Sequence, residues 1–189
     1  MKEIKCTLCA IVFISLLPIT SNAQVQFGVK LGRVYLINSD YYTLNTGYTA
    51  SAYAYPFRKD NISLGVEVGY ISKGYVEEYM FSGDTRPVEY LSLGIPLKYD
   101  IKTQGVFDLF VYTTVSYDIL LQDNFKITVG TAERWNSNFA YTLGTGVLYK
   151  EAFPHFTFDL SLSRETDQFV LNEINTSLDL KLGLLFDGL

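Results

Sequence analysis

A two-residue alternation of apolar and polar side chains constrains this chain more than any other feature. It is clearest over residues 91–100, LSLGIPLKYD, where every odd position is apolar and every even position is small, polar or charged. Because successive side chains of a strand point to opposite faces, the pattern predicts a strand with one apolar and one polar face. A half-buried strand of a soluble sandwich has the same period, so this segment alone does not decide the fold.

The alternation recurs in eight segments bounded by turn residues, without a convincing helical period between them. Tyrosine and phenylalanine are abundant, at 15 and 13 residues, whereas the chain has only 5 prolines, which favours strands. The sequence therefore predicts an all-β chain. The expected strands cover residues 25–36, 48–57, 61–75, 89–101, 106–120, 138–149, 155–165 and 176–186.

The connections between these segments alternate between short and long. The tight ones cover residues 58–60, 102–105 and 150–154. The long, polar ones cover residues 37–47, 76–88, 121–137 and 166–175. An up-and-down meander with every tight turn at one end produces this order, and outer-membrane barrels have short periplasmic turns and longer external loops. A sandwich of arbitrary topology gives no reason for it.

The direction of the two faces distinguishes a membrane barrel from a soluble one. Aromatic residues of the apolar face gather near strand ends, as in the girdles where hydrocarbon meets water. They are Tyr35, Tyr70, Tyr99, Tyr117, Phe139, Tyr149 and Phe186. The polar face is rich in glycine, which suits a narrow lumen. We therefore predict a closed eight-stranded antiparallel up-and-down transmembrane barrel with short periplasmic turns and four longer external loops, because closure pairs every backbone group in the hydrocarbon. A lipocalin-like soluble barrel with an apolar cup is the alternative.

Charged residues of the polar face would then lie inside the barrel. Eight strands leave an interior just wide enough for side chains to fill, so we expect these charges to close the lumen. The expected lumen charge network comprises Lys30, Glu67, Lys98, Asp108, Asp159, Asp179 and Lys181. A tight turn centred near Thr103 would set Lys98 opposite Asp108, which predicts a buried ion pair between them. Pro96 lacks a donor in a sheet without edges, so a bulge or local strain is expected there.

The first residues have the features of an export signal. A short charged stretch precedes an apolar run that ends near Pro18, and small residues follow at Ser21 and Ala23. This pattern predicts a secretory signal peptide over residues 1–23 and an outer-membrane β-barrel domain over residues 24–189. Both cysteines lie in the leader, so the barrel domain has none for a disulfide or a metal site.

Export and charge together narrow the location and the partners. The expected destination is the bacterial cell outer membrane, reached through the periplasm, with outer-membrane lipid around a monomeric barrel. The net charge is −5, and no basic run is longer than a dipeptide, so nucleic acid is not an expected partner.

Four segments resemble, in order, the PorT-like outer-membrane β-barrel family of Bacteroidetes-type bacteria. They are GYTASAYAYPFRKDNISLGVEVGYISKGY at 47–75, YLSLGIPLKYDI at 90–101, FAYTLGTGVLY at 139–149 and LDLKLGLLF at 178–186. The resemblance implies an eight-stranded outer-membrane barrel, often without an assigned activity, whose namesake takes part in a secretion system. Such barrels commonly end on an aromatic residue used in assembly, whereas Phe186 is followed here by Asp187, Gly188 and Leu189.

The sequence lacks the usual signatures of catalysis. It has no glycine-rich phosphate loop, no spaced metal-ligand set and no serine elbow, so no catalytic, metal or cofactor site is expected. The single histidine, His155, begins the seventh expected strand, whereas a lipid A deacylase of this architecture would present a His-x-Ser pair near the outer end. We therefore expect His155 at the membrane interface or the lumen mouth. Asp118 and Glu165, near the outer mouth, could chelate a cation or act as paired carboxylates, although acidic rims are common.

Three functional hypotheses follow. The first is a non-enzymatic outer-membrane barrel with a structural role, or with loops that bind an unknown extracellular ligand or protein. Its candidate loop contacts are Phe125, Arg134 and Trp135, although Trp135 could equally anchor the membrane interface or fold the loop onto itself. The second is a narrow channel, a transport pore or a secretion-system accessory barrel. The third, a lipid-acting outer-membrane enzyme, is disfavoured by the missing residues.

Overall fold

The alternating segments form long strands in a computed structural model, which describes residues 25–37, 42–44, 46–77, 86–123, 137–166 and 176–187. The strands are β1 (Gln26–Leu36), β2 (Tyr42–Leu44), β3 (Thr46–Lys59), β4 (Ile62–Glu77), β5 (Arg86–Ile101), β6 (Phe107–Asp123), β7 (Asn138–Tyr149), β8 (His155–Thr166) and β9 (Thr176–Asp187). All eight expected strands are confirmed, and their ends differ by three residues or fewer. The short strand β2 was not expected. Within the described residues, no helix is long and apolar enough to cross a membrane.

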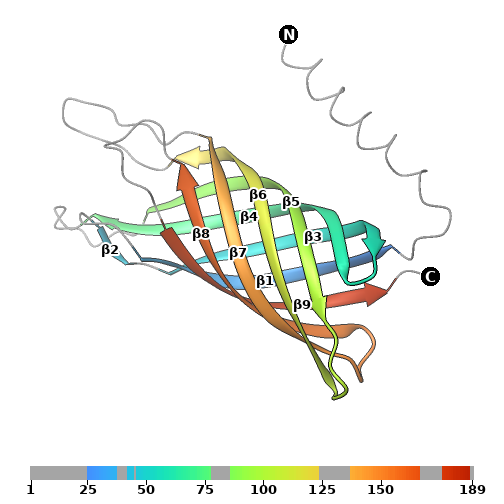
Figure 1. Ribbon diagram of the computed structural model, residues 1–189. Helices are drawn as coiled ribbons and strands as arrows, with labels where there is room; N and C mark the ends of the chain where they lie inside the picture. The colour runs from blue at the N-terminus through green and yellow to red at the C-terminus, as the bar shows by residue number, and fades with distance from the viewer. Residues whose placement is uncertain are drawn as a thin grey trace, which may run out of the picture.

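The sheet closes on itself. Each long strand pairs antiparallel with its neighbours along the chain, and β1 pairs with β9, while β2 pairs with one end of β4. The predicted closed eight-stranded antiparallel barrel is therefore confirmed. The connections 60–61, 102–106 and 150–154 lie at one end of the barrel with the end of β9, which we call the turn end (Figure 1). The opposite end, where β1 stops and β9 begins, is the loop end.

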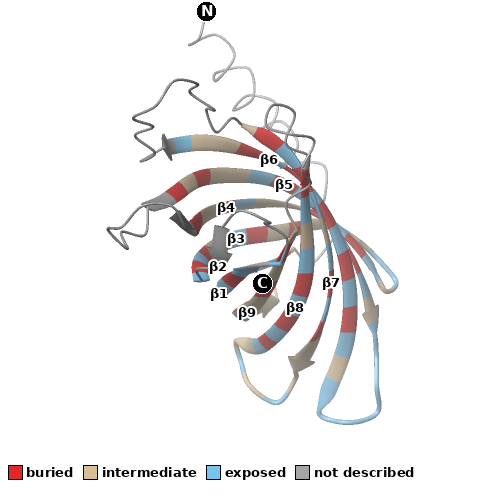
Figure 2. Cartoon of the chain, turned by 90° about the vertical axis from the view of Figure 1, so that its left-hand side faces the viewer, coloured by how far each residue is buried: buried red, intermediate tan, exposed pale blue. Residues whose placement is uncertain are grey.

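The barrel places its apolar side chains outside and its polar side chains inside. Exposed and buried residues alternate along the long strands (Figure 2). Outward Leu31, Leu143 and Leu182 are 66%, 68% and 65% exposed, whereas inward Asp159 is 0% exposed. This is the reverse of a soluble barrel, which buries its large apolar residues. The alternative of a soluble barrel with an apolar cup is therefore wrong.

Inward glycines make room for aromatic rings in the half of the lumen next to the turn end. A Cβ atom on any of these glycines would overlap a ring from an adjacent strand. The pairs are Gly28 with Tyr53, Gly65 with Tyr55, Gly144 with Tyr112 and Gly146 with Phe110. Each ring thus lies against a neighbouring backbone, which lets four large side chains fit inside a narrow barrel.

Two prolines interrupt the strand pairing around Gly65 of β4. The register between β3 and β4 shifts by one residue at a bulge that contains Pro56. The ladder between β4 and β5 lacks the two pairs at Ile95 and Pro96, without a shift in register. The irregularity expected at Pro96 is thus an interrupted ladder, and the bulge lies across β4 at Pro56, because both prolines lack a donor toward the same stretch of β4.

Candidate functional site

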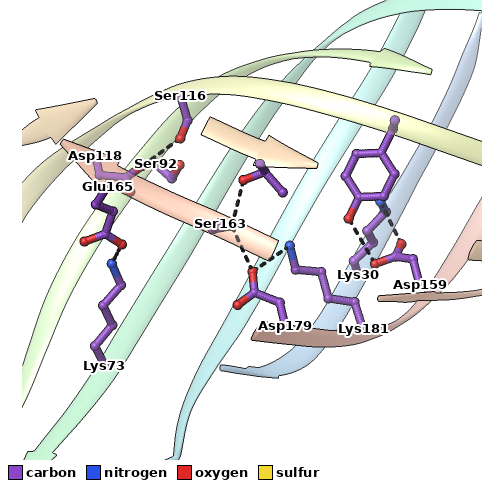
Figure 3. A network of polar contacts seen from close by, with 12 residues as sticks. Lys30, Lys73, Ser92, Ser116, Asp118, Asp159, Ser163, Glu165, Asp179 and Lys181 are labelled. Atoms are coloured by element: carbon purple, nitrogen blue, oxygen red, sulfur yellow. Dashed lines mark hydrogen bonds and ion pairs between the residues drawn. The ribbon is translucent and has the colours of Figure 1, made fainter. Parts of the chain in front are cut away.

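The lumen is the candidate site, because it holds the buried charges of the barrel. Its charged side chains come from strands all around the barrel and form layers from the turn end to the loop end. Figure 3 shows the groups around Lys30, Lys73, Asp118 and Asp179. Within the described residues, no group of three or more His, Cys, Asp or Glu side chains could hold a metal ion.

The layer nearest the turn end is built around Lys98. Its Nζ lies 3.1 Å from Asp100 Oδ1, and 5.0 Å and 5.8 Å from the ring centres of Tyr55 and Phe110. It also donates a 3.5 Å hydrogen bond to Gln26 Oε1. A cation held by one carboxylate and two ring faces satisfies its charge without water.

The predicted ion pair between Lys98 and Asp108 is wrong. The observed register pairs Lys98 with Tyr112, because the ladder between β5 and β6 ends at Ile101 and Leu109, so the turn is centred at residue 105 rather than near Thr103. Asp108 instead lies 2.9 Å from Lys150 Nζ, and it accepts a 2.7 Å hydrogen bond from the Thr103 backbone N–H.

The next layer contains the most deeply buried ion pair with a normal contact distance. Lys30 Nζ lies 2.9 Å from Asp159 Oδ2, and the two residues are 6% and 0% exposed. The same ammonium lies 4.9 Å and 4.6 Å from the ring centres of Tyr53 and Tyr112. Tyr112 also donates a 3.3 Å hydrogen bond to Asp159 Oδ1. Lys30, Asp159 and the two rings therefore form one packed unit across the lumen.

The layers nearer the loop end are more polar. Lys181 Nζ lies 3.3 Å from Asp179 Oδ2, to which the Ser163 hydroxyl donates a 3.4 Å hydrogen bond (Figure 3). Lys73 forms an ion pair with Glu165, and the latter also accepts a 3.4 Å hydrogen bond from Asn138.

Asp118 is satisfied by hydroxyl groups rather than by a lysine. It accepts hydrogen bonds of 2.6 Å from Ser92 and 3.2 Å from Ser116 (Figure 3). Glu165 has Lys73 as its ion-pair partner. Because the two carboxylates are held by different groups, the geometry does not support the idea that Asp118 and Glu165 act as paired carboxylates.

A small cavity lies in the loop-end half of the lumen. Its volume is about 50 Å³, and Glu67, Asp118, Asp179 and Lys181 are among its lining residues. A water molecule needs about 10–15 Å³ of this kind of volume, so the cavity has room for a few waters. The lumen is therefore packed toward the turn end and slightly open toward the loop end.

Sequence reasoning missed the four aromatic rings that pack around the lysines. The expected strand over residues 48–57 has the weakest pattern, because its alternate positions are alanines. The available signal is whether a residue number is odd or even, because residues two apart on a strand share a face. Phe110 and Tyr112 share parity with Asp108, which the sequence predicts inside the barrel. Lys73 shares parity with Glu67 on the same strand, but the expected network does not include it.

His155 lies at the turn end, where β8, β9 and β1 meet. Its Nε2 is 3.0 Å from Asp187 Oδ2, and Gln26 donates a hydrogen bond to the other oxygen of Asp187. The Phe153 ring packs edge-on against the imidazole at 6.1 Å. The candidate loop contacts Phe125, Arg134 and Trp135 lie outside the described residues.

Neither a protein-family model nor a curated protein matches this sequence. Solved structures do match it. Neisserial surface protein A (NspA) has a TM-score of 0.57 at 16% identity, over 87% of this chain and 97% of that one. The outer membrane enzyme PagL has a TM-score of 0.55 at 10% identity, over 84% and 97%. Ail, the attachment invasion locus protein of Yersinia pestis, in complex with the heparin analogue sucrose octasulfate, has a TM-score of 0.51 at 14% identity, over 87% and 100%.

The chain shares the fold of these barrels. At such low identities the likeness extends to the fold alone, so it assigns neither an activity nor a binding partner.

Proposed function

We propose that this chain is an integral protein of the bacterial outer membrane, monomeric and non-enzymatic, with a lumen closed by its own side chains. Its role is structural, or it binds an extracellular ligand or protein at the loop end. The observation that carries the proposal is the combination of an apolar exterior with a lumen packed by rings and ion pairs.

The exterior supports a membrane location. A continuous band of exposed leucine, valine and phenylalanine around a barrel would be unstable in water, and hydrocarbon is the environment that suits it. Aromatic pairs flank the band. Phe27 stacks on Phe186 at 5.0 Å at the turn end, and Tyr117 packs on Phe139 at 4.9 Å at the loop end. Rings at both edges match the interface girdles of outer-membrane barrels. The expected signal peptide over residues 1–23 supports export.

The lumen argues against the channel hypothesis. A conducting pore needs a continuous wet path, but Lys30 and Asp159 meet inside the barrel between the rings of Tyr53 and Tyr112. Lys98 lies between two further rings nearer the turn end. These side chains have partners that hold them in place, and the cavity in the loop-end half of the lumen is only about 50 Å³.

In the part of the chain that the structure describes, no residue set supports the enzyme hypothesis. PagL is described as an enzyme, but its likeness to this chain concerns the fold. His155 contacts the Asp187 carboxylate, and Gln26 donates a hydrogen bond to the same carboxylate. This arrangement joins three strands and does not activate a nucleophile. The PorT-like resemblance and any part in secretion stay predictions.

We assign the partner surface to the connection between β6 and β7, residues 124–136, which contains Phe125, Arg134 and Trp135. Exposed aromatic and arginine side chains often dominate binding energy. Replacing all three by serine should abolish partner binding while the barrel still inserts. A matched control replaces three polar residues of the connection 167–175, namely Asp167, Asn172 and Asn175, and should retain binding.

Single cysteines test the orientation, because a processed chain has no cysteine of its own. We expect a membrane-impermeant maleimide to label Thr131→Cys on intact cells and Gln104→Cys only after permeabilisation. Equal labelling of the two variants on intact cells, or their recovery in the soluble fraction, would refute the proposed location and orientation.

A further inference from the structure

Arg33 is a charged residue on the lipid-facing surface of the barrel. It lies on β1 beside Tyr48 of β3 and Leu180 of β9, and its side chain is exposed. Among the described residues, Arg33 has no ion-pair partner. Lys30 in the lumen, by contrast, is paired with a carboxylate. An anion of the surrounding lipid would satisfy an arginine in this position.

Arg33 lies in the loop-end half of the apolar band. The stacked Phe27 and Phe186 mark the turn-end edge of the apolar band, and Arg33 is six residues further along β1. At about 3.3 Å per residue and a tilt of about 40°, this is roughly 15 Å into a band about 25 Å tall. Arg33 therefore lies past the middle of the band, on the loop-end side, where its side chain can extend toward the interface.

An apolar groove begins beside Arg33. It has a volume of about 820 Å³ and crosses the outer surface from the start of β6 over β7, β8 and β9 to β1. Its wall is hydrocarbon and aromatic, with Leu31, Leu182, Phe158 and Tyr149 among its residues and Arg33 the exposed cation at its edge. The turns after β5 and β7 lie apart from the end of β9, so this face is broad at the turn end (Figure 1). A long apolar surface with one cation matches an acylated lipid with an anionic head.

We propose that the groove binds the lipid A part of lipopolysaccharide, with a phosphate on Arg33 and acyl chains along the wall. This rests on the proposed function, which directs the loop end outward and so puts Arg33 in the outer leaflet. Lipid A is the phosphorylated lipid of that leaflet, and its several acyl chains suit a groove five strands wide. The guanidinium can hold a phosphate through two parallel hydrogen bonds.

The test uses full-length processed protein in nanodiscs of phosphatidylcholine with a small fraction of lipid A. Bound lipid is counted by native mass spectrometry after release from the disc. Arg33→Gln should lower lipid A occupancy about tenfold, a loss typical of one charge-assisted pair. Arg164→Gln is the matched control, because Arg164 is also exposed, near the loop end of β8, but does not line the groove. It should retain the wild-type occupancy.

The outcomes separate the alternatives. Equal losses in both glutamine variants would mean general surface charge, and unchanged occupancy in Arg33→Gln would remove the phosphate contact; either overturns the proposal. Displacement of lipid A by an equal amount of phosphatidylglycerol would show a phospholipid site instead. Arg33→Lys, which keeps the charge, should retain part of the binding if Arg33→Gln does not insert. Wild-type protein that fails to insert refutes the proposed function, whereas inserted protein without lipid A refutes this inference only.

Discussion

Removing Lys30 should destabilise the barrel more than almost any other single lumen substitution. Its partner Asp159 is fully buried, and the two charged atoms are 2.9 Å apart. At an effective dielectric constant of about 20, this attraction is about 6 kcal/mol before desolvation is subtracted. In Lys30→Met, Asp159 would keep only the 3.3 Å hydrogen bond from Tyr112. We expect a loss of about 3–5 kcal/mol in the free energy of unfolding.

The double variant Lys30→Met with Asp159→Leu distinguishes this reasoning from simple loss of packing. Replacing both charges by apolar groups leaves nothing uncompensated, so its stability should return to within about 1 kcal/mol of the wild type, or exceed it. The assay is urea titration of protein refolded into lipid vesicles, with the folded fraction taken from the heat-dependent gel shift in both directions. A single variant that loses less than about 1 kcal/mol, or a double variant as unstable as the single one, would refute the argument.

Three smaller perturbations can be measured by the same titration. Gly144→Ala should cost about 1–3 kcal/mol because its Cβ overlaps a ring, whereas Gly69→Ala, whose nearest new contact is 3.3 Å, should be close to neutral; equal costs would contradict the ring packing. Lys98→Met should cost about 1–3 kcal/mol, less than Lys30→Met, because its partner is 15% exposed; the reverse order would be inconsistent with the layers. Asp108→Asn should cost no more than about 1 kcal/mol, because Lys150 is partly exposed; a larger loss would mean that the pair is more important than its position indicates.

The strands and the direction of their faces could be predicted because both follow from local pattern. A period of two fixes which residues share a face, and turn length fixes which strands are neighbours. Arg33 on the outer face and Asp159 inside follow from parity alone. The glycines of the polar face correctly indicated a narrow lumen. The side chains that pack against them include aromatic rings as well as charged groups.

The pairing of individual charges could not be predicted in the same way. A hairpin centred two residues further along the chain, at residue 105 rather than near Thr103, moves the partner of Lys98 by four residues, from Asp108 to Tyr112. These contacts also join strands that are not adjacent. Lys30 is on β1 and Asp159 is on β8, and each of these strands pairs with β9. Their contact depends on side-chain reach across the lumen, which sequence spacing does not contain.

The central claim is that side chains close the lumen, and single-channel recording in planar bilayers tests it most directly. Protein confirmed as folded by its gel shift should produce no steady current across the bilayer at moderate voltage. A stable ohmic conductance from that same protein would contradict the account, because it would require a continuous water path past Lys30, Asp159 and their aromatic neighbours.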